Sequence, residues 1–167
     1  MIVEDILYGS FEIEEILVAL ISSEEIQRLK DVHMAGPAIL INSAWNETRY
    51  EHSIGVMLLI KKLGGTLEEQ IAGLLHDISH TAFSHVVDLV LYNETDDYHE
   101  QIKARLIEQS LIPTILKQHG FDYKKLLFDD EKWHLLEQKA PLLCCDRIDY
   151  TLREVYRYFS VPLKEIQ

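Results

Sequence analysis

The sequence predicts an all-α fold in which several helices form a single compact bundle with little or no strand. Apolar residues recur at helical spacing along most of the chain, and no segment longer than a few residues alternates strictly between polar and apolar side chains. Seven glycines and four prolines interrupt this pattern without forming a linker. Because 167 residues with a hydrophobic fraction of 47% suffice for one core, we expect residues 1–167 to fold as one domain.

The N-terminal part of the chain is predicted to hold short helices followed by a loop. Ser22 and Glu25 have the spacing of a capping box, which indicates the start of a helix. We expect the helices within residues 1–35 to pack on a core formed by residues 48–158. Residues 36–46 are small or β-branched and include a proline, so they are predicted to form a loop or a short extended arm.

The remaining helices are predicted from their caps and their apolar periodicity. One helix is expected to begin near Thr48 and to end at Gly64-Gly65, and a strongly apolar helix is expected over residues 67–78. A turn is predicted over residues 80–84. Further helices are predicted through Val87 and Leu91 and over residues 98–109, 111–118, 130–138 and 142–158, with a polar loop at 93–97.

The net charge of −12 limits the partners that the protein can bind. Surfaces that grip DNA or RNA are normally basic, so duplex nucleic acid is not an expected partner. An acidic protein that binds a phosphate needs a local cation, which favours a bound metal ion. No apolar run approaches the length of a membrane span, so no membrane partner is expected. The adjacent Cys144 and Cys145 indicate free thiols and a cytoplasmic location, because vicinal cysteines rarely bridge.

Histidines and aspartates gather in apolar surroundings. His76 and Asp77 stand at the end of the apolar helix predicted over residues 67–78, where an unpaired carboxylate would be costly to bury. Taken alone, the pair is compatible with a core histidine and an ion-paired aspartate in a purely structural domain. The surrounding residues favour a functional site, because five of the eight histidines belong to one constellation with acidic residues. The other members of the constellation are His52, His80, His85, His99 and Asp146.

Two imidazoles and two carboxylates form a ligand set that suits a divalent transition ion and leaves room for water. A structural zinc site normally closes with sulfur ligands, so the absence of cysteine from the constellation argues against one. Cys144 and Cys145 are better explained as small core residues.

Three motifs occur in order along the chain. Residues 49–56 read R-Y-E-H-S-I-G-V, residues 72–85 read A-G-L-L-H-D-I-S-H-T-A-F-S-H, and residues 146–150 read D-R-I-D-Y. They resemble the motifs R-[FY]-E-H-S-[LI]-G-V, A-G-L-x-H-D-[LI]-G-H-x-P-F-S-H and D-[RK]-[LFW]-D-Y of the HD superfamily of metal-dependent phosphohydrolases, and most of all its deoxynucleoside triphosphate triphosphohydrolase branch. The resemblance extends over nearly the whole chain and implies a helical HD-domain bundle.

The resemblance also implies a role for each matching residue. It implies one divalent metal ion (Mn, Fe, Ni, Zn or Mg), a group of catalytic residues beside it, and a set of residues that contact the phosphate and the sugar. The implied metal ligands are His52, His76, Asp77 and Asp146, the implied catalytic residues are His80, His85, Asp88 and His99, and the implied substrate-binding residues are Arg49, Tyr150 and Glu154.

Other interpretations of single residues stay open. Arg49 could form a surface ion pair with Glu47 or Glu51, and Tyr150 could be a plain core residue. Residues 33–36 read H-M-A-G where the triphosphohydrolases usually have K-Q-L-G. A methionine cannot make the polar contact of that glutamine, so we expect the nucleoside preference to differ from theirs.

The resulting prediction is a metal-dependent phosphohydrolase that acts on a small-molecule phosphate, a nucleotide or a related phosphate ester, with deoxynucleoside triphosphates among the candidate substrates. The alternative is a catalytically degenerate HD domain that binds a nucleotide or a metal as a regulatory module. The intact set of ligand positions argues against this alternative. No nucleotide-controlled tetramer is expected, and the sequence is compatible with a homodimer.

Overall fold

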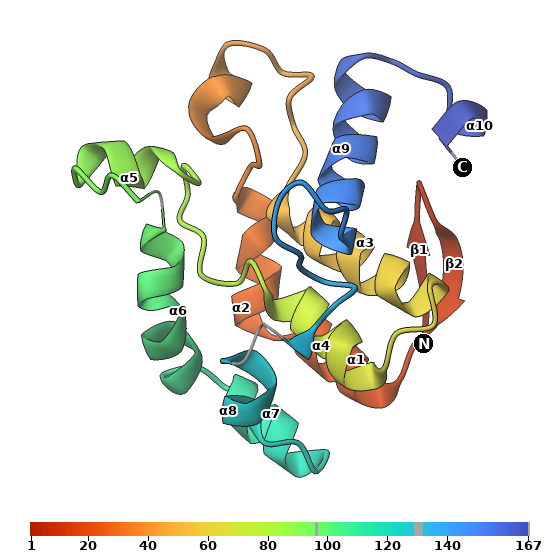
Figure 1. The fold of residues 1–167 in the computed structure, drawn as a ribbon, viewed down its shortest axis with the longest axis vertical. Helices are drawn as coiled ribbons and strands as arrows, with labels where there is room; N and C mark the ends of the chain where they lie inside the picture. Colours follow the sequence, from red (N-terminus) through yellow and green to blue (C-terminus); the bar gives the residue numbers. More distant parts are fainter. Residues whose placement is uncertain (96, 129–131, 167) are drawn as a thin grey trace.

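A computed structural model describes residues 1–95, 97–128 and 132–166, and it is predominantly helical, as the sequence predicts (Figure 1). Strand is confined to one small hairpin in the described residues, which confirms the all-α class. The elements are β1 (Ile2–Asp5), β2 (Gly9–Glu12), α1 (Glu15–Ile21), α2 (Glu24–Gln27), the 3₁₀ helices η1 (Arg28–Asp31) and η2 (Gly36–Leu40), α3 (Arg49–Lys62), α4 (Leu67–Leu75), α5 (Val86–Val90), α6 (Tyr98–Glu108), α7 (Ile112–Gln118), α8 (Tyr123–Leu127), α9 (Cys145–Tyr158) and α10 (Leu163–Ile166).

Helix α3 forms the centre of the fold and packs against both α4 and α9. It begins where predicted, because Thr48 caps it: the Thr48 hydroxyl accepts the Glu51 N–H at 3.2 Å, and the Glu51 carboxylate accepts the Thr48 N–H at 3.0 Å. It ends before Gly64, whose φ of +82° suits glycine. In Figure 1 the hairpin lies on one side of this central group, and α5 to α8 lie on the other.

Helix α4 is shorter than the predicted helix over residues 67–78, since it ends at Leu75. The reason is a long-range hydrogen bond. The Arg28 guanidinium on η1 donates to the carbonyl oxygens of Ile78 and, at 2.9 Å, His80, so these groups are satisfied without further helix. The chain therefore turns immediately after His76, and the predicted turn over residues 80–84 follows.

The N-terminal part of the chain differs from the prediction in three ways. The chain opens with an antiparallel hairpin in which Ile2 pairs with Glu12, whereas only helices were expected within residues 1–35. The predicted capping box is wrong, because Ser22 ends α1, with its hydroxyl on the Val18 carbonyl at 2.8 Å. Residues 36–46, predicted as a loop or a short extended arm, begin with η2, and residues 41–46 form a loop. The division into an N-terminal part and a core at 48–158 stays a prediction.

The helix predicted over residues 130–138 is also wrong for its described part. Residues 129–131 lie outside the described residues, and residues 132–138 contain no α-helix. Their backbone bonds elsewhere: a Glu69 carboxylate oxygen accepts the N–H of Leu135 at 2.7 Å, and the Leu135 carbonyl accepts the Cys145 N–H at 2.7 Å. Helix α9 accordingly begins at Cys145 rather than at residue 142. Among residues 1–95, 97–128 and 132–166, the helices fall short of the length and hydropathy that a membrane span requires.

Candidate metal centre and active site

The four predicted metal ligands come from three elements and lie close together: His52, His76 and Asp146 form a group that could hold a metal ion, and Asp77 borders that group. His52 lies in the middle of α3, His76 and Asp77 follow the end of α4, and Asp146 lies in the first turn of α9. His52 Nε2 lies 3.0 Å from Asp146 Oδ1 and 3.3 Å from His76 Nε2, and His76 Nε2 lies 3.5 Å from Asp146 Oδ1. The packing of α4 and α9 on α3 therefore brings residues almost a hundred positions apart into contact.

Asp77 lies beside this group, and the spacing of the donor atoms of His52, His76 and Asp146 fits a divalent cation. Its Oδ1 is 3.5 Å from His76 Nε2, and its Oδ2 is 3.8 Å from His52 Nε2. Ligands at about 2.1 Å from one ion lie about 3.0–3.4 Å apart in octahedral or tetrahedral geometry. The separations of 3.0, 3.3 and 3.5 Å among His52, His76 and Asp146 are close to these values, whereas Asp77 must shift before one ion contacts all four side chains.

Hydrogen bonds orient both imidazoles. His76 Nδ1 donates to the Gly73 carbonyl at 2.7 Å, and His52 Nδ1 donates to Asp149 Oδ2 at 2.8 Å. Since a carbonyl or an ionised carboxylate only accepts, the proton of each neutral ring lies on Nδ1 and the lone pair lies on Nε2. In both rings Nε2 faces the shared point, which is the arrangement of metal-binding histidines.

The electrostatics also favour a positive charge at this point. Burial alone would lower the pKa of His52, but hydrogen bonds with Asp146 and Asp149 raise it to about 10. Burial opposes ionisation of Asp77, yet the Arg49 guanidinium and the adjacent His76 hold its pKa well below the usual range.

Arg49 is buried beside the ligands, so the interpretation as a surface ion pair with Glu47 or Glu51 is wrong. The Arg49 side chain, 6% exposed, donates from Nη1 to Asp77 Oδ2 and from Nε to the Ser84 hydroxyl at 3.1 Å. Its fixed charge therefore stands at the edge of the ligand group, where it lines a pocket.

The predicted catalytic histidines form a second cluster beside the first. The rings of His80 and His99 stack at 3.9 Å between centroids, and His85 stands edge-on to both at 5.0 and 5.1 Å. His80 Nε2 lies 3.3 Å from Asp77 Oδ1, which links the two clusters. The His85 side chain is 46% exposed, so it stands at the solvent edge.

Asp88 lies near His85, but the two do not form a hydrogen bond. Asp88 Oδ2 is 3.8 Å from His85 Nδ1, too long for direct orientation of the ring. Asp88 Oδ1 instead accepts the Tyr98 N–H at 2.9 Å and the Asn93 amide at 2.6 Å. Asp88 thus anchors the loop that leads into α6 and, through it, the position of His99.

Residues of both clusters line one pocket of about 380 Å³. A larger cavity of about 720 Å³ lies beside α7 and α8, but no histidine lines it, so we assign the chemistry to the smaller one. Its lining contains most of the predicted site residues, together with side chains that were not predicted. The lining residues are Met34, Arg49, His76, Asp77, His80, His85, His99, Glu100, Glu137, Asp146, Tyr150 and Glu154.

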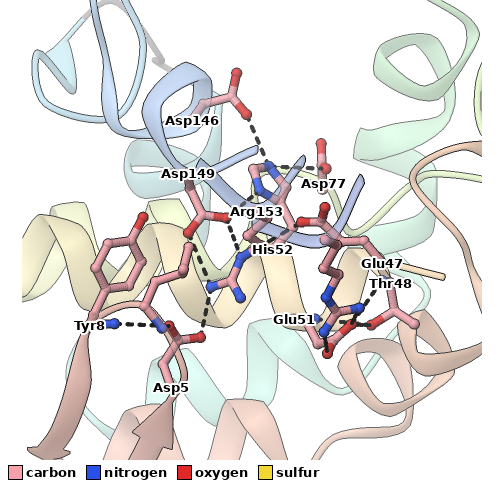
Figure 2. A network of polar contacts seen from close by, with 12 residues as sticks. Asp5, Tyr8, Glu47, Thr48, Glu51, His52, Asp77, Asp146, Asp149 and Arg153 are labelled. Atoms are coloured by element: carbon pink, nitrogen blue, oxygen red, sulfur yellow. Dashed lines mark hydrogen bonds and ion pairs between the residues drawn. The ribbon is translucent and has the colours of Figure 1, made fainter. Parts of the chain in front are cut away.

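The sequence interpretation missed the residues behind the ligands. Asp149 holds His52, Arg153 holds Asp149 through Nε at 2.8 Å, and Asp5 accepts from Arg153 at 2.7 Å (Figure 2). One signal was present in the sequence: residues 146, 149 and 153 have the spacing of one helix face. Nothing in the sequence pattern connected Asp5 to that face.

A helical domain in which a histidine, a His-Asp pair and a distant aspartate meet beside a pocket defines a class of protein. Residues 49–154 match the HD domain family, and the chain belongs to that family.

Relatives support the assignment. The chain is 59% identical over its full length to the uncharacterized protein YdhJ of Bacillus subtilis, of which it covers 51%. It is 37% identical over its full length to the metal-dependent phosphohydrolase cns2 of Cordyceps militaris, of which it covers 48%. The chain thus spans about half the length of these curated relatives.

A crystal structure of a hypothetical protein from Aquifex aeolicus resembles the fold closely. The TM-score is 0.73 with 30% sequence identity, and the match covers 94% of this chain and 46% of that one. The fold is therefore shared with a solved protein over almost the entire described length.

Proposed function

We propose that this domain is a metal-dependent phosphohydrolase that cleaves a small-molecule phosphate, with nucleotides as the preferred class. The grouping of His52, His76 and Asp146, with Asp77 beside them, carries the proposal, because it places a candidate cation site next to the pocket that Arg49 lines. A bound divalent cation would polarise a phosphoryl oxygen and lower the pKa of water.

The chain's own residues supply binding and proton transfer. Arg49 offers a fixed positive charge to a phosphoryl oxygen, where negative charge develops during cleavage. His80, His85 and His99 surround the same space, and a histidine placed there can pass a proton to the leaving oxygen, typically worth about 10²–10⁴-fold in rate. Tyr150 also lines the pocket, where it can contact a sugar or a base.

The charge of the pocket favours a substrate with few negative charges. Among the described lining residues, Arg49 is the sole lysine or arginine, and it already pairs with Asp77. Glu100, Glu137 and Glu154 also line the pocket. A nucleoside monophosphate or another phosphate monoester fits this balance better than a triphosphate, because each added phosphate would meet more carboxylates. Deoxynucleoside triphosphates are the second class, supported by the motif resemblance.

A screen of metals against substrates tests the proposal. Metal-free protein is loaded with Mn²⁺, Fe²⁺, Ni²⁺, Zn²⁺ or Mg²⁺ and incubated with nucleoside mono-, di- and triphosphates and simple phosphate esters, and the products are identified. We expect release of phosphate that requires the metal and falls about 10²-fold in Arg49→Lys, which keeps the charge but loses the planar fork. Binding of nucleotides without any product would contradict hydrolysis and assign the domain to the regulatory alternative.

Location and assembly are part of the proposal. Cys144 and Cys145 are both buried and free, which agrees with a cytoplasmic protein whose thiols stay reduced. A homodimer is compatible with the proposed function, and sedimentation of the intact protein measures it.

A further inference from the structure

A chain of charged side chains runs from the metal ligand His52 to the N-terminal hairpin (Figure 2). His52 Nδ1 donates to Asp149 Oδ2 at 2.8 Å, and Arg153 donates to Asp149 from Nε at 2.8 Å and from Nη2 at 3.1 Å. Arg153 Nη2 also donates to Asp5 Oδ2 at 2.7 Å. Asp5 is the last residue of β1, so the hairpin is joined to a metal ligand through three consecutive contacts.

The whole chain of contacts is buried. The Arg153 side chain is 2% exposed, Asp5 is 6% exposed, and His52 and Asp149 are fully buried. Glu47 adds a further carboxylate, with its Oε1 3.7 Å from Arg153 Nε. Breaking one buried pair leaves its partner charged and unsatisfied, so the contacts are strongly coupled.

Helix α3 leaves space for this chain of contacts. Gly55 lies in the middle of α3, where glycine is unfavourable relative to alanine. A Cβ atom at Gly55 would lie 1.9 Å from Arg153 Nη2 and 2.1 Å from Asp149 Oδ1. Glycine at position 55, although unfavourable in a helix, thus leaves the space in which the Arg153–Asp149 pair packs against α3.

The two carboxylate oxygens of Asp5 accept hydrogen bonds from different parts of the fold. Its Oδ1 accepts the N–H groups of Leu7 at 2.8 Å and Tyr8 at 3.2 Å, which fixes the turn of the hairpin. Its Oδ2 accepts from Arg153. The turn and the Arg153 guanidinium therefore donate hydrogen bonds to the same carboxylate. The centroid of the Tyr8 ring also lies 5.9 Å from the guanidinium carbon of Arg153.

We propose that Asp5 and Arg153 are positioning residues for the metal site, through which the N-terminal hairpin holds Asp149 and so orients the His52 imidazole toward the cation. The inference rests on the metal site of the proposed function. Partners one contact behind a ligand typically change metal affinity 10–100-fold. Asp5 acts two contacts further back, so the effect expected for it is about tenfold.

Asp5→Asn tests the inference with little change of shape. The asparagine oxygen can still accept from the turn, but its NH₂ group then faces Arg153 and cannot accept a hydrogen bond. Glu4→Gln is the matched control, because it removes one negative charge from the exposed neighbour on the same strand. Binding of Mn²⁺ to metal-free intact protein is measured by calorimetry, with circular dichroism to establish that each variant is folded.

We expect the Kd for Mn²⁺ to rise about tenfold in Asp5→Asn and to stay within about twofold of wild type in Glu4→Gln. Arg153→Lys is the second variant, because lysine cannot reach Asp149 and Asp5 together. In the double variant, the rise in the Kd for Mn²⁺ should be smaller than the two single effects combined, because both substitutions interrupt the same series of contacts.

The results separate the two ideas. A wild-type protein that binds no stoichiometric cation overturns the proposed function and this inference together. A wild type that binds one cation, with unchanged Kd in Asp5→Asn or, if that variant does not fold, in Arg153→Lys, overturns the inference alone. A loss of thermal stability without any change in Kd would show that the hairpin contact is only structural, and it counts against the inference as well.

Discussion

The two sides of the pocket are built differently. The ligand side, with His52 on α3 and Asp146 on α9, is carried by two fourteen-residue helices that pack on each other, and its orienting partner Asp149 is buried. The histidine side is carried by the turn after α4 and the first turn of α6, and His85 stands half exposed beside the short helix α5.

This difference separates two physical requirements. A cation site needs donor atoms fixed within a fraction of an ångström, which a packed core with satisfied polar groups provides. A group that exchanges protons with substrate and solvent needs access, which the edge of the pocket provides. The ligand side is therefore expected to be preformed, while the histidine side governs turnover.

The largest expected effect is on the ligand side. Asp77→Asn keeps the shape of the side chain but removes the negative charge beside Arg49 and His76. We expect loss of metal retention and a fall in turnover of at least about 10³-fold, with helical circular dichroism retained. Metal analysis after gel filtration checks this, with the exposed Asp31→Asn as control. A variant that keeps a full equivalent of metal would remove Asp77 from the ligand set.

The histidine side should respond in the opposite way. His85→Gln is expected to lower turnover about 10²-fold while the Kd for the metal stays within about twofold, because His85 is remote from the ligand atoms. His119→Gln, on an exposed residue after α7, is the control. If His85→Gln weakens metal binding as strongly as turnover, the two sides of the pocket are not separable.

Two glycines test how tightly the ligand side is packed. Gly55→Ala would place a methyl group against the fully buried Arg153 and Asp149, and we expect it to destabilise the fold by about 2 kcal/mol despite the better helix propensity of alanine. In Gly73→Ala the nearest contact is the tip of Ile60 at 2.5 Å, which can rotate, so about 1 kcal/mol is expected. Urea unfolding of both variants measures the difference, and equal losses would contradict the special role of position 55.

A pH effect is expected from Glu47, which is fully buried and whose two carboxylate oxygens accept no hydrogen bond from the described residues. Burial raises the pKa of Glu47 to about 8, against the partial attraction of Arg153. The folded protein therefore binds a proton that the unfolded chain has released, and stability falls as pH rises from about 4.5 through 8. We expect Glu47→Gln to be more stable than wild type by about 1 kcal/mol at pH 8 and similar at pH 5. Urea unfolding of both proteins at the two pH values measures this. An equal stability difference between Glu47→Gln and wild type at pH 5 and pH 8 would contradict the prediction.

The sequence alone could predict which residues gather at the candidate metal site, because their order and motifs are local signals. His52 follows a capping threonine in a strongly apolar helix, and the His76-Asp77 pair ends another. Helix α3 was predicted with its correct start and end for the same reason: its caps at Thr48 and Gly64 are encoded within a few residues.

What was missed depends on contacts between distant segments. Helix α4 stops early because Arg28 satisfies carbonyls fifty positions away, and residues 132–138 do not form a helix because Glu69 binds their backbone. The hairpin has strands of four residues, too short for an alternation pattern. Asp5 and Arg153 are separated by most of the chain, so no spacing rule could join them.

Anomalous diffraction from crystals grown with Mn²⁺ tests the shared cation site most directly. We expect one strong peak, about 2.0–2.3 Å from His52 Nε2, His76 Nε2 and a carboxylate oxygen of each of Asp77 and Asp146. A peak at any other place, or a metal held without Asp146, would contradict the four-ligand site.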